Sequence, residues 1–222
     1  MISYIEEFFA YNHLVVSAIL TLLLLLLYFK IKDIETMFTF IKWTLFINFL
    51  SFYGFLLFLD QFDYQKHLPL HLCYLTEFCI FLSLLFKTKI LYPWLVLNSL
   101  GGGLTGFLNS NLPENSFIIE IIHLHLSHFN LLFFSMIAFK MRFIISKSSF
   151  VKSLFFNIAV FSFIVFFNIV FSSNYWFTVK KPQGNNLAVL FPEWPYYLFG
   201  LIIIGLISYY LTFKLFSKKT FQ

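Results

Sequence analysis

The run LLLLLL at residues 22–27 decides the fold class of this chain. It lies inside an apolar segment of about 20 residues, the length that a helix needs to cross a hydrocarbon core roughly 30 Å thick. Six more apolar segments of similar length follow. The seven helices predicted to span the membrane lie near 12–29, 40–59, 69–86, 90–108, 117–140, 150–171 and 194–214.

The composition indicates a membrane protein and excludes a soluble globule. Hydrophobic residues make up 60% of the 222 residues and charged residues 11%, with a mean hydropathy of +0.84. So little polar surface cannot cover a water-soluble domain, and the segments between the helices are too short to fold alone. We therefore expect an all-α, polytopic bundle of seven transmembrane helices that forms one transmembrane domain over residues 1–222.

The basic residues divide unevenly between the two sides of this bundle. Twelve of the fifteen fall on one side: Lys30, Lys32, Lys42, Lys87, Lys89, Lys140, Arg142, Lys147, Lys152, Lys214, Lys218 and Lys219. The other side carries the remaining basic residues and most acidic ones: Lys66, Lys180, Lys181, Glu6, Glu7, Asp60, Asp63, Glu114 and Glu193. Because cytoplasmic loops are rich in Lys and Arg, we expect the N-terminus outside and the C-terminus in the cytoplasm. The predicted location is the cell (inner) membrane, as a multi-pass protein, and no nucleic-acid partner is expected.

Polar side chains inside the predicted spans gather towards their outer ends. The third and fifth segments carry His71, Cys73, Glu77, Glu120, His123, His125, Ser127 and His128. At a rise of about 1.5 Å per residue, these residues lie roughly 4 to 16 Å below the outer surface. A polar group that faces lipid costs several kcal/mol, so such groups usually face the interior of the bundle. The sequence therefore predicts a polar cavity in the outer half of the membrane.

Three histidines with the spacing H-x-H-x-x-H raise the question of a metal. On a helix, His123 and His125 point about 200° apart, so one face holds only His125 and His128. A metal would need ligands from another helix, such as His71 or Glu77. We expect no metal and no cofactor. Gly101 to Gly103 could allow close approach of a ligand, but small residues in membrane bundles more often allow helices to pack.

Other single polar residues have structural interpretations. His13, Asn48 and Asn157 are expected to form ordinary hydrogen bonds between helices, and His67, which is near a loop, is expected to be solvated. Cys73 and Cys79 lie about 240° apart around one helix and roughly 9 Å apart along it. That separation is too large for a disulfide, so both are predicted to be free thiols.

Cys73 could serve as a nucleophile if a base on a facing helix, such as His128, removes its proton. A cavity in the outer leaflet favours lipid acyl groups as substrate for such a thiol. The alternative is that Cys73 is a small buried hydrophobic residue, as free Cys often is.

Three stretches resemble the signature segments of the YwaF-like family of bacterial membrane proteins. They are LPLHLCYLTEF at 68–78, HLSHFNLLFFSMIAF at 125–139 and NYWFTVKKPQGNNLAVLFPEWPYYLF at 174–199. The chain departs from that pattern at Phe129, where a Gly usually follows the motif His, and at 191–193, where a small turn is usual. Distant eukaryotic relatives in the transmembrane protein 164 family resemble phospholipid acyltransferases with a cysteine nucleophile. This resemblance implies that Cys73 is that nucleophile.

The resemblance also singles out residues at the outer end of the bundle: His71, Cys73, His128, Asn174, Tyr175, Lys181, Pro182, Trp194, Pro195 and Tyr197. Lys181 could bind a lipid phosphate or a substrate carboxylate, or it could be an ordinary interfacial lysine. Aromatic residues such as Trp194 suit the membrane interface.

Two functional hypotheses follow. In the first, the protein transfers or hydrolyses lipid acyl groups. Its predicted catalytic residues are Cys73, His128 and His71, and its predicted substrate-binding residues are Glu77, His125, Asn174, Tyr175, Lys181 and Trp194. Its expected partners are membrane lipids. In the second, the protein is a small-solute transporter or a ligand-binding membrane protein, although the cytoplasmic halves of its helices lack the polar residues that a path needs. The sequence determines neither the substrate nor the oligomeric state.

Overall fold

The computed structural model of the chain describes residues 12–110, 112, 116–183 and 186–217. Five charged residues used in the topology argument lie outside this described part: Glu6, Glu7, Glu114, Lys218 and Lys219. Within it the regular structure is entirely helical. The α-helices are α2 (His13–Lys30), α3 (Ile34–Phe58), α4 (Leu72–Leu85), α5 (Tyr92–Leu108), α6 (Ile118–Lys140), α7 (Lys147–Phe171) and α8 (Tyr196–Leu215), and two short 3-10 helices are η1 (Tyr175–Phe177) and η2 (Leu187–Leu190).

Five of these helices are long and apolar enough to cross a membrane: α2, α3, α6, α7 and α8. The chain is therefore a multi-pass membrane protein. α4 has 14 residues and is about 21 Å long, while α5 has 17 and is about 26 Å long. Neither reaches the length of a full span alone, so the predicted seven spans are not established by helix length.

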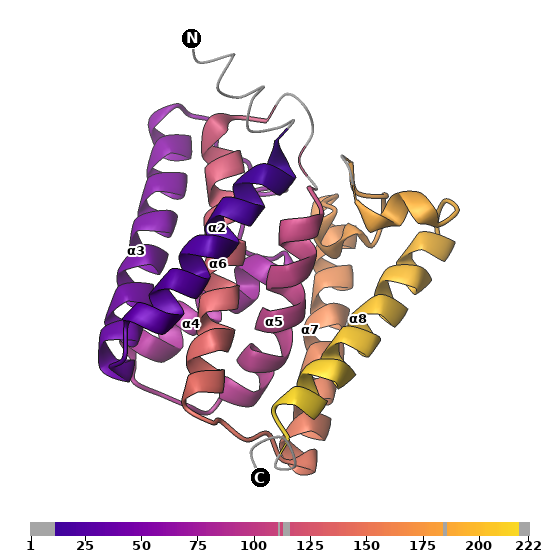
Figure 1. Cartoon of the computed structure of the whole chain (residues 1–222). Coiled ribbons are helices and arrows are strands. Elements are labelled where there is room, and N and C mark those ends of the chain that lie inside the picture. The colour runs from indigo at the N-terminus through magenta and orange to yellow at the C-terminus, as the bar shows by residue number, and fades with distance from the viewer. Residues whose placement is uncertain (1–11, 111, 113–115, 184–185, 218–222) are drawn as a thin grey trace.

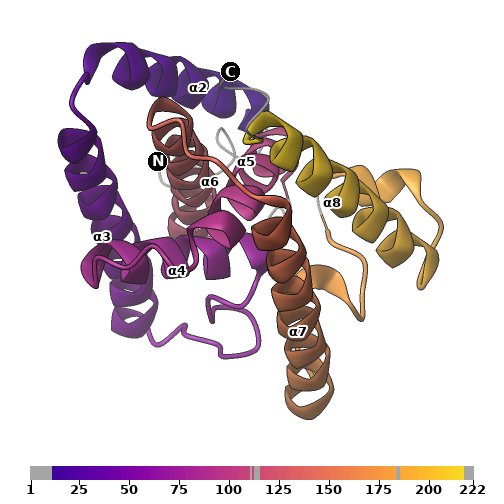
Figure 2. The same cartoon turned by 90° about the horizontal axis from the view of Figure 1, so that it is seen from below.

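The two central helices are α5 and α6, which pack on one another and on most other helices. Successive helices run in alternating directions (Figure 1). The connections α3–α4, α5–α6 and α7–α8 lie at the upper end in this view, and the connections α2–α3, α4–α5 and α6–α7 lie at the lower end. Figure 2 shows that α7 stands apart from α2 and α3, on the other side of α5.

Local hydrogen bonds explain where two helices begin. The carboxylate of Asp33 accepts hydrogen bonds from the backbone N–H of Thr36 at 2.8 Å and from its hydroxyl at 2.7 Å. This N-cap starts α3 at Ile34, so the predicted start at residue 40 is too late. Ser146 likewise caps α7 by accepting from the Ser149 N–H at 3.1 Å. Hydropathy misses such first turns because they are polar.

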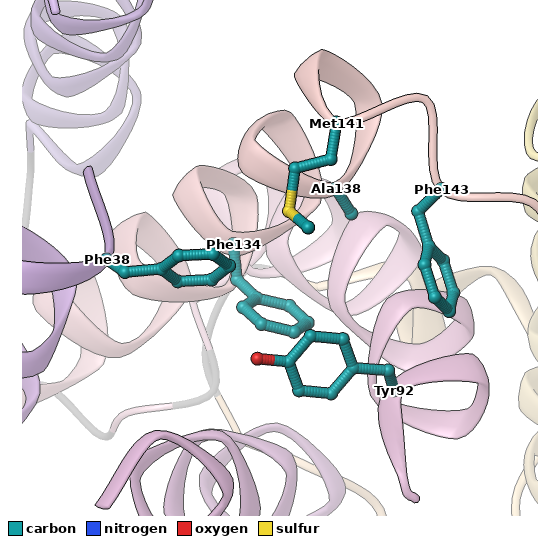
Figure 3. Close-up of a pocket in the computed structure, with 6 residues that line it drawn as sticks. All are labelled: Phe38, Tyr92, Phe134, Ala138, Met141 and Phe143. Carbon is teal, nitrogen blue, oxygen red and sulfur yellow. The ribbon is translucent and has the colours of Figure 1, made fainter. Parts of the chain in front are cut away.

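The lower end of the bundle is closed by apolar side chains. Figure 3 shows a small pocket whose walls are Phe38, Tyr92, Phe134, Ala138, Met141 and Phe143. The ring of Tyr92 meets the rings of Phe134 and Phe143 edge-on, with centroids 5.4 and 6.0 Å apart. Phe134 is 1% exposed. Apolar side chains therefore fill the space between α3, α5 and α6 at this end.

Candidate functional site

A cavity of about 1380 Å³ extends from the upper end of the bundle down between α5, α7 and α8. Its walls come from α4, α5, α6, α7 and α8 and from the connections at the upper end. Four of the predicted site residues line it: His71, Cys73, His128 and Asn174. The other five lie outside its lining: Glu77, His125, Tyr175, Lys181 and Trp194.

Glycines of α5 bring Cys73 and His128 to one face of that helix. A Cβ on Gly102 would lie 3.2 Å from Cys73 Sγ, and a Cβ on Gly106 would overlap the ring of His128. The two glycines are one turn apart, about 6 Å along the helix. The thiol and the imidazole therefore both pack against α5 about one turn apart, and no hydrogen bond joins them within the described residues. Cys73 is a free thiol, as predicted, and so is Cys79.

The glycines at 101–103 serve helix packing. α5 continues as a helix through them. A Cβ on Gly101 would overlap Ser208 of α8, and a Cβ on Gly103 would lie 2.6 Å from Leu132 Cγ of α6. Each glycine therefore permits close approach of a different neighbouring helix, which confirms the packing interpretation.

The hydrogen bonds of His128 fix which of its ring nitrogens can act as a base. Nδ1 lies 2.6 Å from the carbonyl oxygen of Leu124. A carbonyl only accepts, so Nδ1 carries the proton in the neutral ring and Nε2 keeps its lone pair. His128 lines the cavity, and its Nε2 is not occupied by another group in the described part of the chain. The imidazole is thus arranged as a proton acceptor.

His71 has the opposite arrangement. Its Nδ1 accepts a hydrogen bond from the backbone N–H of Trp176 at 3.3 Å. In the neutral ring Nε2 therefore carries the proton and is a donor. His71 directly precedes α4, and its ring meets those of Tyr175 and Phe177 at centroid distances of 5.1 and 5.0 Å. Because the lone pair on its Nδ1 is already used, His71 is better suited to hold the α7–α8 connection in place than to act as a base.

Tyr175 and Trp176 tie the α7–α8 connection to the segment before Cys73. The Tyr175 hydroxyl donates to Tyr64 O at 2.7 Å and accepts from Leu68 N–H at 3.0 Å. The Trp176 indole donates to Leu70 O at 2.7 Å. Burial raises the pKa of the Tyr175 phenol, so it remains a protonated donor at neutral pH. Two stretches that are distant in sequence, 68–78 and 174–199, therefore meet in space.

Two asparagines hold the unusual backbone of this connection. Trp176 and Phe177 have φ values of 57° and 54°, a left-handed conformation that bulky residues rarely adopt. Asn168 binds both backbone groups of Tyr175, at 3.0 Å to N and 2.8 Å to O. Asn174 accepts from the N–H groups of residues 179 and 180 at 3.0 and 2.9 Å. The surrounding hydrogen bonds thus maintain the strained conformation.

Lys181 and Trp194 make polar contacts within the α7–α8 connection. Lys181 Nζ donates to Phe191 O at 2.8 Å and lies 3.4 Å from Glu193 Oε1. The indole of Trp194 donates to Thr178 O at 3.1 Å. A different lysine, Lys66, lines the cavity. Lys66 was not predicted as a site residue, because its position against the cavity depends on how the α3–α4 connection folds.

Glu77 belongs to a buried polar cluster between α3, α4 and α6. Its Oε1 accepts from the amides of Asn48 at 2.9 Å and Asn130 at 2.8 Å. The side chain is fully buried, and its Oε2 has no hydrogen-bond partner among the described residues. Asn48 also donates to Ser127 at 3.1 Å and accepts from His123 at 3.1 Å. This cluster joins three helices, as expected for Asn48.

The histidines of α6 point to different neighbours. His123 stacks on Phe52 of α3 with ring centroids 3.9 Å apart. His125 meets His13 of α2 at 4.7 Å, and its buried Nε2 has no hydrogen-bond partner in the described structure. His128 lies on α5. The predicted divergence of His123 and His125 is confirmed, and no group of three His, Cys, Asp or Glu side chains in the described residues is placed to hold a metal.

Three further polar residues have predicted environments: His67, His13 and Asn157. His67 is not solvated as predicted: its side chain is 9% exposed and its Nε2 lies 3.5 Å from Glu120 Oε1. The two residues come together because the α3–α4 connection folds over α6. His13 Nε2 binds Gly106 O at 3.0 Å, and Asn157 accepts from the Trp94 indole at 2.6 Å. The expected interhelical hydrogen bonds of His13 and Asn157 are confirmed.

Comparison with known proteins gives one match. The sequence model described as the TMEM164 family matches residues 8–213, nearly the whole chain. No curated protein and no solved structure matches. The match covers all three stretches singled out in the sequence, and it is to a family of membrane proteins.

Proposed function

The chain belongs to the TMEM164 family, and from this premise we propose that it transfers or hydrolyses acyl groups of membrane lipids through Cys73 and His128. The observation that carries the proposal is that both residues line one cavity and lie against the same face of α5. A thiol needs a neighbouring base to become a nucleophile. The free lone pair on Nε2 makes His128 that base.

The reaction begins when His128 Nε2 takes the proton from Cys73 Sγ, directly or through one water molecule. The thiolate attacks the carbonyl carbon of a lipid ester. A C–S bond forms, the ester C–O bond breaks, and the departing lysolipid oxygen takes the proton from His128. An acyl thioester remains on Cys73. A lysolipid hydroxyl, or water, then gives its proton to His128 and attacks the thioester, and the thiol recovers that proton.

The surroundings of the cavity favour a lipid over a water-soluble solute. Lys66 lies on the cavity wall at the upper end, with its Nζ 3.3 Å from Asp63 Oδ2. An ammonium group at this place also attracts a lipid phosphate. The lower end is filled by the apolar side chains around Phe134. A transporter needs a route through both halves of the bundle, so these features support the enzyme over the alternative of a small-solute transporter.

The same proposal includes seven spans, with the N-terminus outside and the C-terminus in the cytoplasm of the cell (inner) membrane. Helix directions alternate, and α4 and α5 pack among longer helices, so neither must cross the lipid unaided. The connections at the lower end carry Lys32, Lys87, Lys89 and Arg142. The positive-inside rule assigns that end to the cytoplasm.

Two matched cysteine variants test the chemistry. Cys73→Ala should abolish hydroxylamine-sensitive labelling of the purified protein by a phospholipid with an alkyne-tagged acyl chain, whereas Cys79→Ala should retain it. Cys79 is the appropriate control because it is the other free thiol of the described chain and lies on the same helix. His128→Asn should slow labelling by about 10²–10⁴-fold, the usual contribution of a general base. Equal labelling of wild type and Cys73→Ala would contradict the proposal.

A further inference from the structure

The helices α7 and α8 form a V that is closed at its lower end. Phe150 of α7 stacks on Phe213 of α8 with ring centroids 4.4 Å apart and meets Tyr209 at 5.8 Å. Above these contacts the two helices diverge, and the segment with η1 and η2 connects their upper ends (Figure 1). α5 packs on both helices and forms the back of the V.

The inner surfaces of this V belong to the same cavity as Cys73 and His128. The apolar residues that line it are Leu154, Ile158 and Phe161 of α7 and Leu198, Ile202 and Leu206 of α8. Gly205 lies among them, and a Cβ added there would meet nothing within 4 Å. The cavity therefore continues from the reactive residues into an apolar groove between two membrane helices.

The polar groups at the back of the groove satisfy one another. Asn157 Oδ1 accepts from the Trp94 indole at 2.6 Å, and Asn98 Nδ2 donates to Trp94 O at 2.9 Å. The side chains of Asn98 and Asn157 also lie within hydrogen-bonding distance of each other, at 3.4 and 3.5 Å. A polar solute would find few free partners here, whereas a hydrocarbon chain needs none.

We infer that the groove between α7 and α8 holds one acyl chain of the lipid substrate, which enters sideways from the membrane. From Leu198 to Tyr209 the groove extends about 16 Å along α8. This length is close to one leaflet, which is half of a hydrocarbon core roughly 30 Å thick. The aromatic contacts of Phe150 at the closed end limit how deep the chain reaches. The role of the groove in catalysis rests on the proposed lipid chemistry. Binding of an acyl chain to the groove can be measured without that chemistry.

Photocrosslinking in detergent micelles tests the groove directly. The probe is a phosphatidylcholine with a diazirine in its acyl chain, and the protein is the full chain with Cys73→Ala, so that no turnover is required. We expect crosslinks within residues 154–161 and 198–209. Gly205→Phe, which fills the groove, should lower them on the order of tenfold, the loss that displacing about two buried methylene groups predicts.

Gly54→Phe is the matched control, because a Cβ at Gly54 also meets nothing within 4 Å and Gly54 lies on α3, away from the groove. It should leave crosslinking unchanged. Ile158→Trp fills the groove from α7 and replaces Gly205→Phe if that variant does not fold. Crosslinking that neither groove variant lowers, or that lies mainly on α2 and α3, would overturn the inference. If the groove is crosslinked as expected but the wild-type protein forms no thioester at Cys73, the proposed chemistry alone is contradicted.

Discussion

The imidazole of His128 occupies the space that a side chain at Gly106 would need. A Cβ at this position would overlap the ring atoms Cγ, Cδ2 and Nε2. The carbonyl of Gly106 also binds His13 Nε2 at 3.0 Å. One glycine of α5 thus sets the position of a histidine on α6 and fixes another on α2.

Gly106→Ala is therefore expected to displace His128. Overpacking of this kind costs about 1–3 kcal/mol, and the acyl-thioester labelling of Cys73 should fall with it. Gly54→Ala is the control, since it adds a methyl group to a helix position with free space and should not lower stability. Thermal unfolding in detergent, together with labelling of both variants, makes the comparison. Full labelling of Gly106→Ala would mean that the observed position of His128 is not needed.

Glu77 is predicted to be a hydrogen-bond acceptor that holds three helices together. Glu77→Gln keeps an oxygen for the amides of Asn48 and Asn130 and should change stability little. Glu77→Leu leaves both buried donors without this partner, at a cost of about 1–3 kcal/mol for each. Thermal unfolding of the two variants measures the difference. Equal loss in both would show that the negative charge of Glu77, and not its oxygen, is what the cluster requires.

The hydroxyl of Tyr175 is predicted to hold the segment 64–71 in place. Tyr175→Phe removes its bonds to Tyr64 and Leu68 and should raise amide hydrogen exchange in that segment, with a loss of about 1–3 kcal/mol for the buried groups left unpaired. Tyr210→Phe on α8 is the control, because Tyr210 is 49% exposed. Unchanged exchange at 64–71 would contradict the role given to Tyr175.

The proposed topology predicts which end of the bundle faces the cytoplasm. In a chain with Cys73→Ser and Cys79→Ser, a new thiol at Gln61→Cys should react with a membrane-impermeant maleimide in intact cells. One at Ser148→Cys should react only after the cells are lysed. Both positions are exposed and lie at opposite ends of the bundle. The reverse pattern of labelling would invert the topology.

Hydropathy predicted, in order, the seven α-helices of the described residues, because a long apolar run in this composition has few alternatives to a helix. It placed the start of α3 too late, since the cap at Asp33 and the polar residues Glu35 and Thr36 lie outside the apolar run. It could not reveal that α4 has only 14 residues, because the apolar residues before Leu72 are held by side chains of the α7–α8 connection.

The candidate site was predictable only where a polar residue lies within an apolar segment, as for Cys73, His71 and His128. Which nitrogen of each histidine is free depends on backbone groups of Leu124 and Trp176, and sequence alone does not show such contacts. The groove between α7 and α8 has no polar signature at all. The residues that line it are apolar, as lipid-facing residues are. Only the divergence of α7 and α8 makes their facing surfaces a groove.

The apolar packing around Phe134 also has an electrical consequence. On the side of α3 and α6 the cavity ends above Phe38, Tyr92 and Phe134, so the layer where these three side chains meet is the insulating part of the protein there. Where water fills the cavity above it, the membrane voltage falls mainly across this layer, at about 2.3 kcal/mol per elementary charge for each 100 mV. In the proposed topology the Cys73 thiol beside Gly102 then lies on the outer side of the voltage drop, and the proposed proton transfer between Cys73 and His128 is almost independent of the membrane potential.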